Sequence, residues 1–164
     1  MQEYLHVTQS TSSTMRIVIQ RAKGASVSID GRVNGSIGRG FAVLIGIAQT
    51  DTEQIADKMM DKMFKLRVFE DENGKTNLNL DQVDGGLLLV SQFTLYADVK
   101  SGNRPGFSRA CKPDRAEELY DYIVSECRKR NDKVGTGEFG ADMKVALVND
   151  GPFTIILDSD ELSL

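Results

Sequence analysis

Two apolar runs constrain the fold of this chain more than any other feature of its sequence. Residues 41–48 (FAVLIGIA) contain no polar side chain, and residues 87–96 (LLLVSQFTLY) begin with four apolar ones. Continuous apolar runs of this length are typical of strands that are buried on both faces. Both runs are far shorter than the roughly 20 residues that cross a bilayer. They therefore predict the interior of a soluble sheet, and we expect no contact with a membrane.

Further strands are indicated on either side of these runs. Residues 15–21 (MRIVIQR) alternate, and Asp30-Gly31 separates two more extended segments. An Asp-Gly pair between such segments favours a two-residue hairpin, because both positions tolerate a positive φ. Residues 143–148 and 153–157 are predicted as two strands with a turn between them.

Two amphipathic helices complete the predicted elements. We expect the first to begin after an N-cap at Asp51, with Gln54 in the capping-box position, and the second to run from Pro113 to about Arg130. The apolar stripes are Ile55, Met59, Met63 and Leu66 in the first, and Ala116, Leu119, Tyr120, Ile123, Val124 and Cys127 in the second. The sum is one α+β domain of mostly antiparallel strands, with both helices covering one side.

The scarcity of histidine limits the chemistry of this domain. The single histidine is His6, so residues 15–164 contain none. A hydrolase that relies on imidazole as its base is therefore excluded, as is a histidine-bearing zinc site. The two cysteines, Cys111 and Cys127, lack metal-ligand spacing and fit a reducing compartment such as the cytoplasm. We expect no cofactor and no metal.

Residues 1–14 (MQEYLHVTQSTSST) precede the first patterned segment, which opens at Met15. They have no basic stretch followed by an apolar one, so they do not resemble a signal peptide. We expect 1–14 to be a flexible extension and 15–164 to be the functional domain.

Four groups of residues are candidates for function. At 91–94, three polar side chains interrupt a buried strand: Ser91, Gln92 and Thr94. Either the strand emerges into solvent there, or the polar groups meet a ligand, since an unpaired buried polar group costs about 1–3 kcal/mol. Thr94 lacks an obvious base. Asn149-Asp150-Gly151-Pro152 forms the second group, a turn that presents backbone carbonyls in a fixed direction.

Arg21 is the third candidate. It ends an apolar strand face, so its guanidinium either extends to solvent or is held by carbonyls or a carboxylate. The fourth is the segment 97–112, in which four basic residues outnumber Asp98. This segment is either a solvated loop or an edge that faces phosphates, with Phe107 available to stack on a base. The net charge of −4 argues against broad binding to a phosphate backbone, and we expect no DNA partner.

Taken in order, several motifs resemble those of the D-aminoacyl-tRNA deacylases, also called the D-tyrosyl-tRNA deacylase family. They are MRIVIQR at 15–21, SQFTL at 91–95, GNRPGF at 102–107, FGADM at 139–143 and NDGPFT at 149–154. The resemblance covers essentially all of 15–164. It implies a cytoplasmic homodimer with a three-layer fold, whose partner is the aminoacylated 3′ end of tRNA. It also implies hydrolysis of D-aminoacyl-tRNA and, as a secondary substrate, of glycyl-tRNA.

The resemblance assigns roles to individual residues. Ser91, Gln92, Phe93 and Thr94 match the segment around the scissile ester, and Phe107 matches a position near the terminal adenine. Gly151 and Pro152 match a Gly-cisPro motif that each subunit inserts into its partner's site to reject L side chains. Arg21 and Met143 match positions that support this motif. Phe153 departs from the family pattern, in which a smaller residue is commoner after Gly-Pro.

Three mechanistic hypotheses remain open on the sequence. The one we favour is attack by water assisted by the ribose hydroxyl of the RNA, with the backbone N–H of Phe93 or Thr94 stabilising the oxyanion. The second is a general esterase with Thr94 as nucleophile. The third is a non-catalytic dimer that binds an RNA end or a small ligand.

Overall fold

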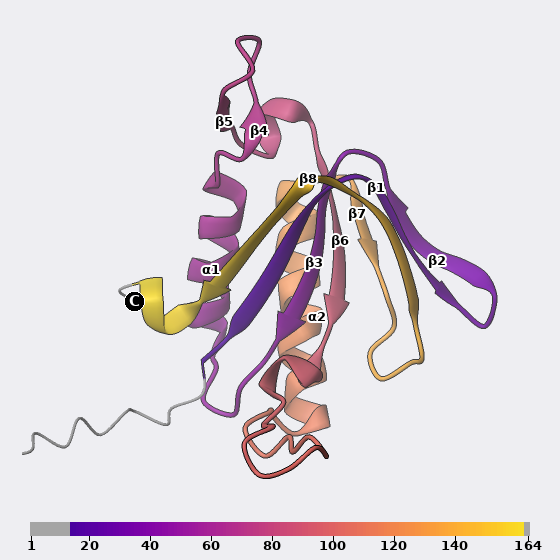
Figure 1. Ribbon diagram of the computed structural model, residues 1–164, viewed down its shortest axis with the longest axis vertical. Helices are drawn as coiled ribbons and strands as arrows, with labels where there is room; N and C mark the ends of the chain where they lie inside the picture. Colours follow the sequence, from indigo (N-terminus) through magenta and orange to yellow (C-terminus); the bar gives the residue numbers. More distant parts are fainter. Residues whose placement is uncertain (1–13, 163–164) are drawn as a thin grey trace, which may run out of the picture.

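The computed structural model describes residues 14–162, and its elements are mostly strands with two long helices between them (Figure 1). Three short 3-10 helices are labelled η. The elements are β1 (Arg16–Ile29), β2 (Arg32–Ile37), β3 (Gly40–Gly46), α1 (Glu53–Lys65), β4 (Phe69–Glu70), β5 (Thr76–Leu78), η1 (Asp81–Val83), β6 (Gly86–Ser91), η2 (Phe93–Tyr96), α2 (Pro113–Arg130), β7 (Val134–Thr136), β8 (Lys144–Asp158) and η3 (Ser159–Leu162).

One curved sheet forms the body of the molecule. Its strand order is β2-β1-β3-β6-β7, and β8 pairs with β1. The pairs β3–β6 and β6–β7 are parallel, and the others are antiparallel. The Asn34 side chain on β2 donates a hydrogen bond of 2.8 Å to the Thr136 carbonyl on β7. The two ends of the strand order therefore approach each other, and the sheet curves almost into a barrel.

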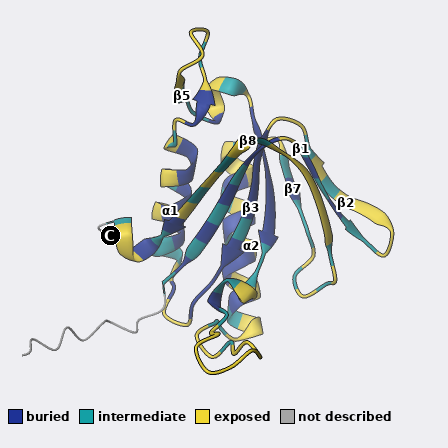
Figure 2. Ribbon diagram, viewed as in Figure 1, coloured by how far each residue is buried: buried dark blue, intermediate teal, exposed yellow. Residues whose placement is uncertain are grey.

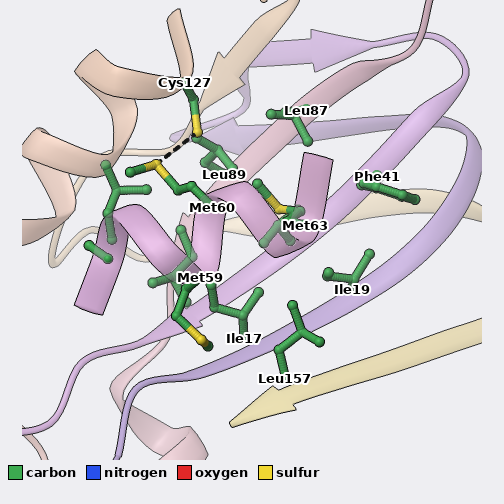
Figure 3. Packing of buried hydrophobic residues seen from close by; sticks show 14 of the residues in the cluster. Ile17, Ile19, Phe41, Met59, Met60, Met63, Leu87, Leu89, Cys127 and Leu157 are labelled. Carbon is green, nitrogen blue, oxygen red and sulfur yellow. Dashed lines mark hydrogen bonds between the residues drawn. The ribbon is translucent and has the colours of Figure 1, made fainter. Parts of the chain in front are cut away.

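Both helices pack against one face of this sheet, as predicted (Figure 1). Figure 3 shows the core between them, where side chains of β1, β3 and β6 meet those of α1 and α2. All six residues of the predicted α2 stripe are buried. Cys127 lies among them and donates a hydrogen bond of 3.5 Å to the Met60 sulfur. Burial raises the pKa of the Cys127 thiol to about 12, so it acts as a core hydrophobe.

The start of α1 differs from the prediction by one residue. The N-cap is Thr52, whose hydroxyl accepts the Ile55 N–H at 3.3 Å. Asp51 is buried and instead accepts the Ala48 N–H at 2.7 Å. The carboxylate closes the turn that leaves β3, and the capping role passes to the next polar residue.

The C-terminal segment also differs, because residues 143–148 and 153–157 do not form two separate strands. Residues 144–148 and 153–157 belong to the single strand β8, which pairs with β1 from Arg16 to Ser28, and Met143 precedes it. The hairpin at Asp30-Gly31 is confirmed, and both residues have a positive φ.

The described residues form one α+β domain, with most of the buried positions on the sheet and the inner faces of the helices (Figure 2). None of their helices is long and apolar enough to cross a membrane. The three-layer arrangement stays a prediction. Of the predicted extension 1–14, only Thr14 is described, so the expectation for the rest of it, including His6, lies outside the described residues.

Candidate active site

The polar segment 91–94 lies where β6 ends. Ser91 is the last paired residue, and the Gln92 N–H donates the final ladder bond to the Ile45 carbonyl at 2.8 Å. The partner strand β3 ends one residue later, so the chain turns into η2. The strand predicted over residues 87–96 therefore ends at Ser91. Phe93 is consequently 56% exposed rather than directed into the sheet.

The hydrogen-bonding partner of Thr94 limits what its hydroxyl can do. Its oxygen accepts from the Gln92 side-chain amide, and it has no carboxylate or amine partner among the described residues. An amide N–H donates and cannot take a proton. Thr94 therefore lacks the base that a nucleophilic hydroxyl needs.

A cavity of about 720 Å³ opens beside this segment. Its walls come from the end of β6, the start of η2, the turn at 107–111, the first turn of α2 and residues 139–143 and 145. Five of the nine predicted site residues line it, namely Ser91, Gln92, Phe93, Phe107 and Met143. The sequence left two alternatives for residues 91–94, a strand that emerges into solvent or a ligand site. The structure shows that the strand ends here and also that a cavity opens beside it.

Two aromatic rings form one wall of the cavity. Phe93 and Phe107 meet edge to face, with ring centroids 5.0 Å apart and an interplanar angle of 68°. They come from η2 and from the segment that follows it, so neither ring is part of the sheet. An exposed aromatic wall of this kind suits a planar heterocycle such as a nucleobase.

Met143 also lines the cavity and lies against Gly137. A Cβ atom added to Gly137 would lie 2.3 Å from the Met143 sulfur. Glycine at 137 thus leaves the space that the thioether occupies. Residues 139–143 line the cavity along their whole length.

Gly151 and Pro152 lie in a bulge of β8. Thr154 pairs with Gln20 and Asn149 pairs with Ala22, so four residues on β8 (150–153) lie opposite the single residue Arg21. We call residues 150–153 the Gly-Pro bulge. Its Gly151–Pro152 peptide bond is cis, and both residues are exposed.

Arg21 holds the Gly-Pro bulge from within. Its side chain donates to the Asp150 carbonyl at 3.0 Å and to the Val68 carbonyl at 2.7 Å, and only 8% of the residue is exposed. Its guanidinium carbon also lies 4.7 Å from the centroid of the Phe153 ring. The sequence left open whether the guanidinium extends to solvent or is held by protein groups. The structure shows that two backbone carbonyls hold it. Phe153 thus packs against this guanidinium.

Within one chain, the Gly-Pro bulge and the cavity lie far apart. Along the sheet, Arg21 is level with Leu87, which is four residues before Ser91, and β8 is three strands from β6. At ~3.3 Å per residue and ~4.8 Å per strand, the separation is roughly 20 Å. In Figure 1, β8 passes β4 and β5 at one end of the molecule, while the segment after β6 lies at the other.

Comparisons with known proteins show which family the chain belongs to. The family model described as D-Tyr-tRNA(Tyr) deacylase matches residues 18–158, which is most of the chain. The chain belongs to this family.

Similar proteins support the assignment to the deacylase family. The D-aminoacyl-tRNA deacylase of Cellvibrio japonicus is 54% identical over 143 residues, covering 87% of this chain and 98% of the relative. That of Chromohalobacter salexigens is 54% identical over 145 residues, covering 88% and 100%. A solved structure titled c-Myc DNA unwinding element binding protein has a TM-score of 0.82 and 41% identity, covering 87% and 97%.

The fold of this family member is also found at much lower identity. A probable eukaryotic D-amino acid tRNA deacylase matches with a TM-score of 0.79 and 18% identity, covering 88% of this chain and 99% of that one. This likeness shows that the two chains share a fold.

Cys111, Ala116 and Val145 also line the deacylase cavity, and sequence reasoning missed them. Their side chains carry no motif, and only the folded chain brings them together. Burial raises the pKa of the Cys111 thiol, which keeps it protonated at neutral pH and unsuited to nucleophilic attack. Among residues 14–162, no group of three histidine, cysteine, aspartate or glutamate side chains is arranged to hold a metal.

Proposed function

We propose that this D-aminoacyl-tRNA deacylase binds the aminoacylated 3′ end of tRNA in the cavity beside η2 and hydrolyses the ester there. The observation that carries the proposal is the cavity itself, which brings Ser91, Gln92, Phe93 and Phe107 together. The edge-to-face pair of phenylalanine rings offers a contact surface for the terminal adenine.

The start of η2 supplies electrostatic stabilisation. Phe93 and Thr94 are the first two residues of a helical segment, so their N–H groups have no acceptor within it. Neither N–H donates to another described residue. The N–H of Phe93, which lines the cavity, and the adjoining N–H of Thr94 can donate hydrogen bonds to the oxyanion that forms when water adds to the ester carbonyl.

Water assisted by the RNA is the nucleophile in this mechanism. The water oxygen bonds to the carbonyl carbon, the tetrahedral intermediate collapses, and the ribose 3′ oxygen leaves with a proton. The one carboxylate among the described residues that line the cavity is Asp142, and both of its oxygens accept from the Lys144 ammonium at 3.0 Å, so we assign proton transfer to the adjacent ribose 2′-hydroxyl. An aminoacyl ester is already activated, and placement accounts for much of the remaining barrier.

The nucleophile can be tested with two changes. Thr94→Ala should still release D-tyrosine from D-tyrosyl-tRNA, whereas wild-type protein should lose activity on tRNA that ends in 2′-deoxyadenosine. Mass spectrometry should detect no acyl-enzyme. Loss of turnover in Thr94→Ala with a covalent adduct on the wild type would instead establish a threonine esterase. Binding of D-tyrosyl-tRNA without any turnover would establish a non-catalytic module.

The chiral filter in this proposal comes from a second copy of the chain. The Gly-Pro bulge lies roughly 20 Å from the cavity of its own chain, yet its residues are exposed. The strand that carries it exposes Val145, Leu147, Val148 and Ile156, and exposed apolar patches mark interfaces. A homodimer would bury these side chains and bring each bulge into the partner's cavity. There the bulge carbonyls would clash with an L side chain, while a D side chain or glycine would be accepted.

Mixed dimers provide the test of this composite site. Gly151→Ala alters the bulge, because a methyl group at this positive φ would lie 3.2 Å from Arg21 Nη2. Phe93→Pro removes one N–H and one aromatic ring from the cavity wall, at a helix position where proline is tolerated. We expect each homodimer to lose roughly 10²-fold or more in kcat.

Mixing the two variants should restore activity, since each mixed dimer contains one site with an intact cavity and an intact bulge. Recovery of about a quarter of the wild-type rate is expected if half of the dimers are mixed. An absence of recovery, with mixed dimers shown to form, would place the bulge and cavity of one chain in the same site.

The compartment follows from the substrate. Aminoacylated tRNA is used in the cytoplasm, and the two cysteines of this chain are free thiols. We therefore assign the protein to the cytoplasm.

A further inference from the structure

Positive charge is concentrated in one segment of this acidic chain. Residues 97–112 carry Lys100, Arg104, Arg109 and Lys112 against the single acidic residue Asp98. The segment thus has a net charge of +3 within a chain whose net charge is −4, so the rest of the chain carries −7. An acidic protein repels a polyanion over most of its surface, and a local basic region then decides where contact occurs.

The four cations in 97–112 are open to an external anion, and the only one of them with a side-chain hydrogen bond within 14–162 is Arg109, which donates to the Tyr96 carbonyl at 3.5 Å. All four are exposed, and none forms an ion pair with another residue in 14–162. Several cations elsewhere in 14–162 are instead paired with carboxylates. At the far ends of α1 and α2, for example, Lys65 pairs with Asp61 and Lys129 pairs with Glu126.

The backbone of this segment is held in place at several points. Asp98 and Gly106 exchange two backbone hydrogen bonds of 2.7 and 2.9 Å, which close a small loop that carries Lys100 and Arg104. The Ala110 N–H donates to the Phe107 carbonyl at 3.1 Å, and the Cys111 N–H donates to the Ile47 carbonyl at 2.9 Å. The cations therefore project from an anchored backbone, which lowers the entropy lost when they bind.

The segment also borders the cavity. Phe107, Ser108 and Lys112 line it directly, and the exposed coil that follows η2 forms the end of the molecule beneath the sheet (Figure 2). A polynucleotide whose last base lies against Phe107 would continue outward past the basic side chains.

We infer that residues 97–112 bind the phosphates of the nucleotides that precede the terminal adenosine of the substrate. Lys100 and Arg104 contact phosphates farther from the ester, and Arg109 and Lys112 contact those nearer to it. This inference rests on the proposed function, because it takes the cavity as the place where the terminal adenosine binds. It makes the segment a positioning surface for RNA, with a contribution to KM and to association rather than to the chemical step.

The test compares two substrates of different length. Lys100→Ser/Arg104→Ser removes two charges from the closed loop, and Lys58→Ser/Lys62→Ser removes two exposed charges from α1 as a matched control. Release of D-tyrosine is measured from D-tyrosyl-tRNA and from D-tyrosyl-adenosine, which has no preceding phosphates, over a range of salt concentrations.

We expect the loop variant to raise KM for D-tyrosyl-tRNA about tenfold with kcat unchanged, and to leave D-tyrosyl-adenosine unaffected. The slope of log(kcat/KM) against log[salt] should become shallower by about 1.4, at roughly 0.7 for each contact with a single strand. The control variant should match wild type in all three respects.

Three results would overturn the inference: an unchanged KM for D-tyrosyl-tRNA, an equal loss on both substrates, or an equal effect of the control variant. Duplex DNA that competes as well as the tRNA acceptor end would also overturn it in favour of a general polyanion surface. Failure of the wild type to hydrolyse either substrate would instead contradict the proposed function itself.

Discussion

Arg21→Lys tests how the Gly-Pro bulge is held. The guanidinium donates to two carbonyls from different segments, Asp150 at 3.0 Å and Val68 at 2.7 Å. A lysine keeps the charge but has one nitrogen, and it lacks the planar fork that reaches both oxygens. We expect it to satisfy one carbonyl and leave the other without its donor.

The size of the effect follows from these contacts. A hydrogen bond from a charged donor contributes about 1.5–3 kcal/mol, and a cation–π contact such as that with Phe153 adds roughly 0.5–2 kcal/mol. The nearby Asp150 carboxylate, at 3.8 Å from Nε and 35% exposed, adds little. Loss of one hydrogen bond and part of the cation–π contact should therefore lower the free energy of unfolding by about 2–4 kcal/mol.

Urea unfolding at neutral pH measures this loss. With a slope of about 2 kcal/mol per molar urea, the midpoint should fall by about 1–2 M. D- and L-tyrosyl-tRNA hydrolysis should be measured in parallel, because a displaced bulge should weaken discrimination between them by roughly tenfold or more. Arg32→Lys, on the exposed strand β2, serves as the control and should leave both quantities unchanged.

A midpoint within about 0.3 M of wild type would refute this reasoning, since it would mean that the second carbonyl does not need the guanidinium. Lower stability with unchanged chiral discrimination would separate the two roles. In that case Arg21 would stabilise the fold without positioning the bulge.

Three further predictions concern the cavity and its supports. Burial raises the pKa of Asp51 from 3.8 to about 6, so the folded state binds this proton more tightly than the unfolded state. The free energy of unfolding should therefore fall by up to about 3 kcal/mol as pH rises from 4 to 6. Asp51→Asn should remove that slope in denaturant titrations, and an identical slope in both proteins would contradict the assignment. Gly137→Ala should push the Met143 thioether into the cavity and raise KM several-fold, while unfolding changes by less than about 1 kcal/mol because the thioether is flexible. Phe107→Leu should raise KM for D-tyrosyl-adenosine roughly tenfold through lost stacking; an unchanged KM would remove this ring from the adenine contact.

Sequence patterns predicted the elements whose side chains repeat regularly. Helix α2 was predicted from Pro113 to about Arg130 with its whole buried stripe, because six apolar residues recur at helical spacing over its length. The hairpin at Asp30-Gly31 was predicted from local backbone chemistry, which needs no information about distant residues.

The errors arose where a distant segment decides the local conformation. Residues after Ser91 continue a strand-like pattern, but β3 ends beside them and offers no further backbone partner. Residues 149–153 resemble a turn, yet β1 pairs with β8 on both sides of them and makes them a bulge. Such outcomes depend on the length of a neighbouring strand, which local propensity does not encode.

Distant segments also determine how far apart the two candidate site motifs lie in one chain. Motifs 91–95 and 149–154 both resemble family segments, but the sheet separates them by roughly 20 Å in one chain. If both motifs act on one ester, a second copy of the chain must supply the Gly-Pro bulge. Activity should then depend on protein concentration in the range where the dimer dissociates. Dilution below the dimer dissociation constant should therefore reduce the rate per chain, and added Phe93→Pro protein should restore it by supplying intact bulges. A rate per chain that stays constant while sedimentation shows monomers would exclude a shared site.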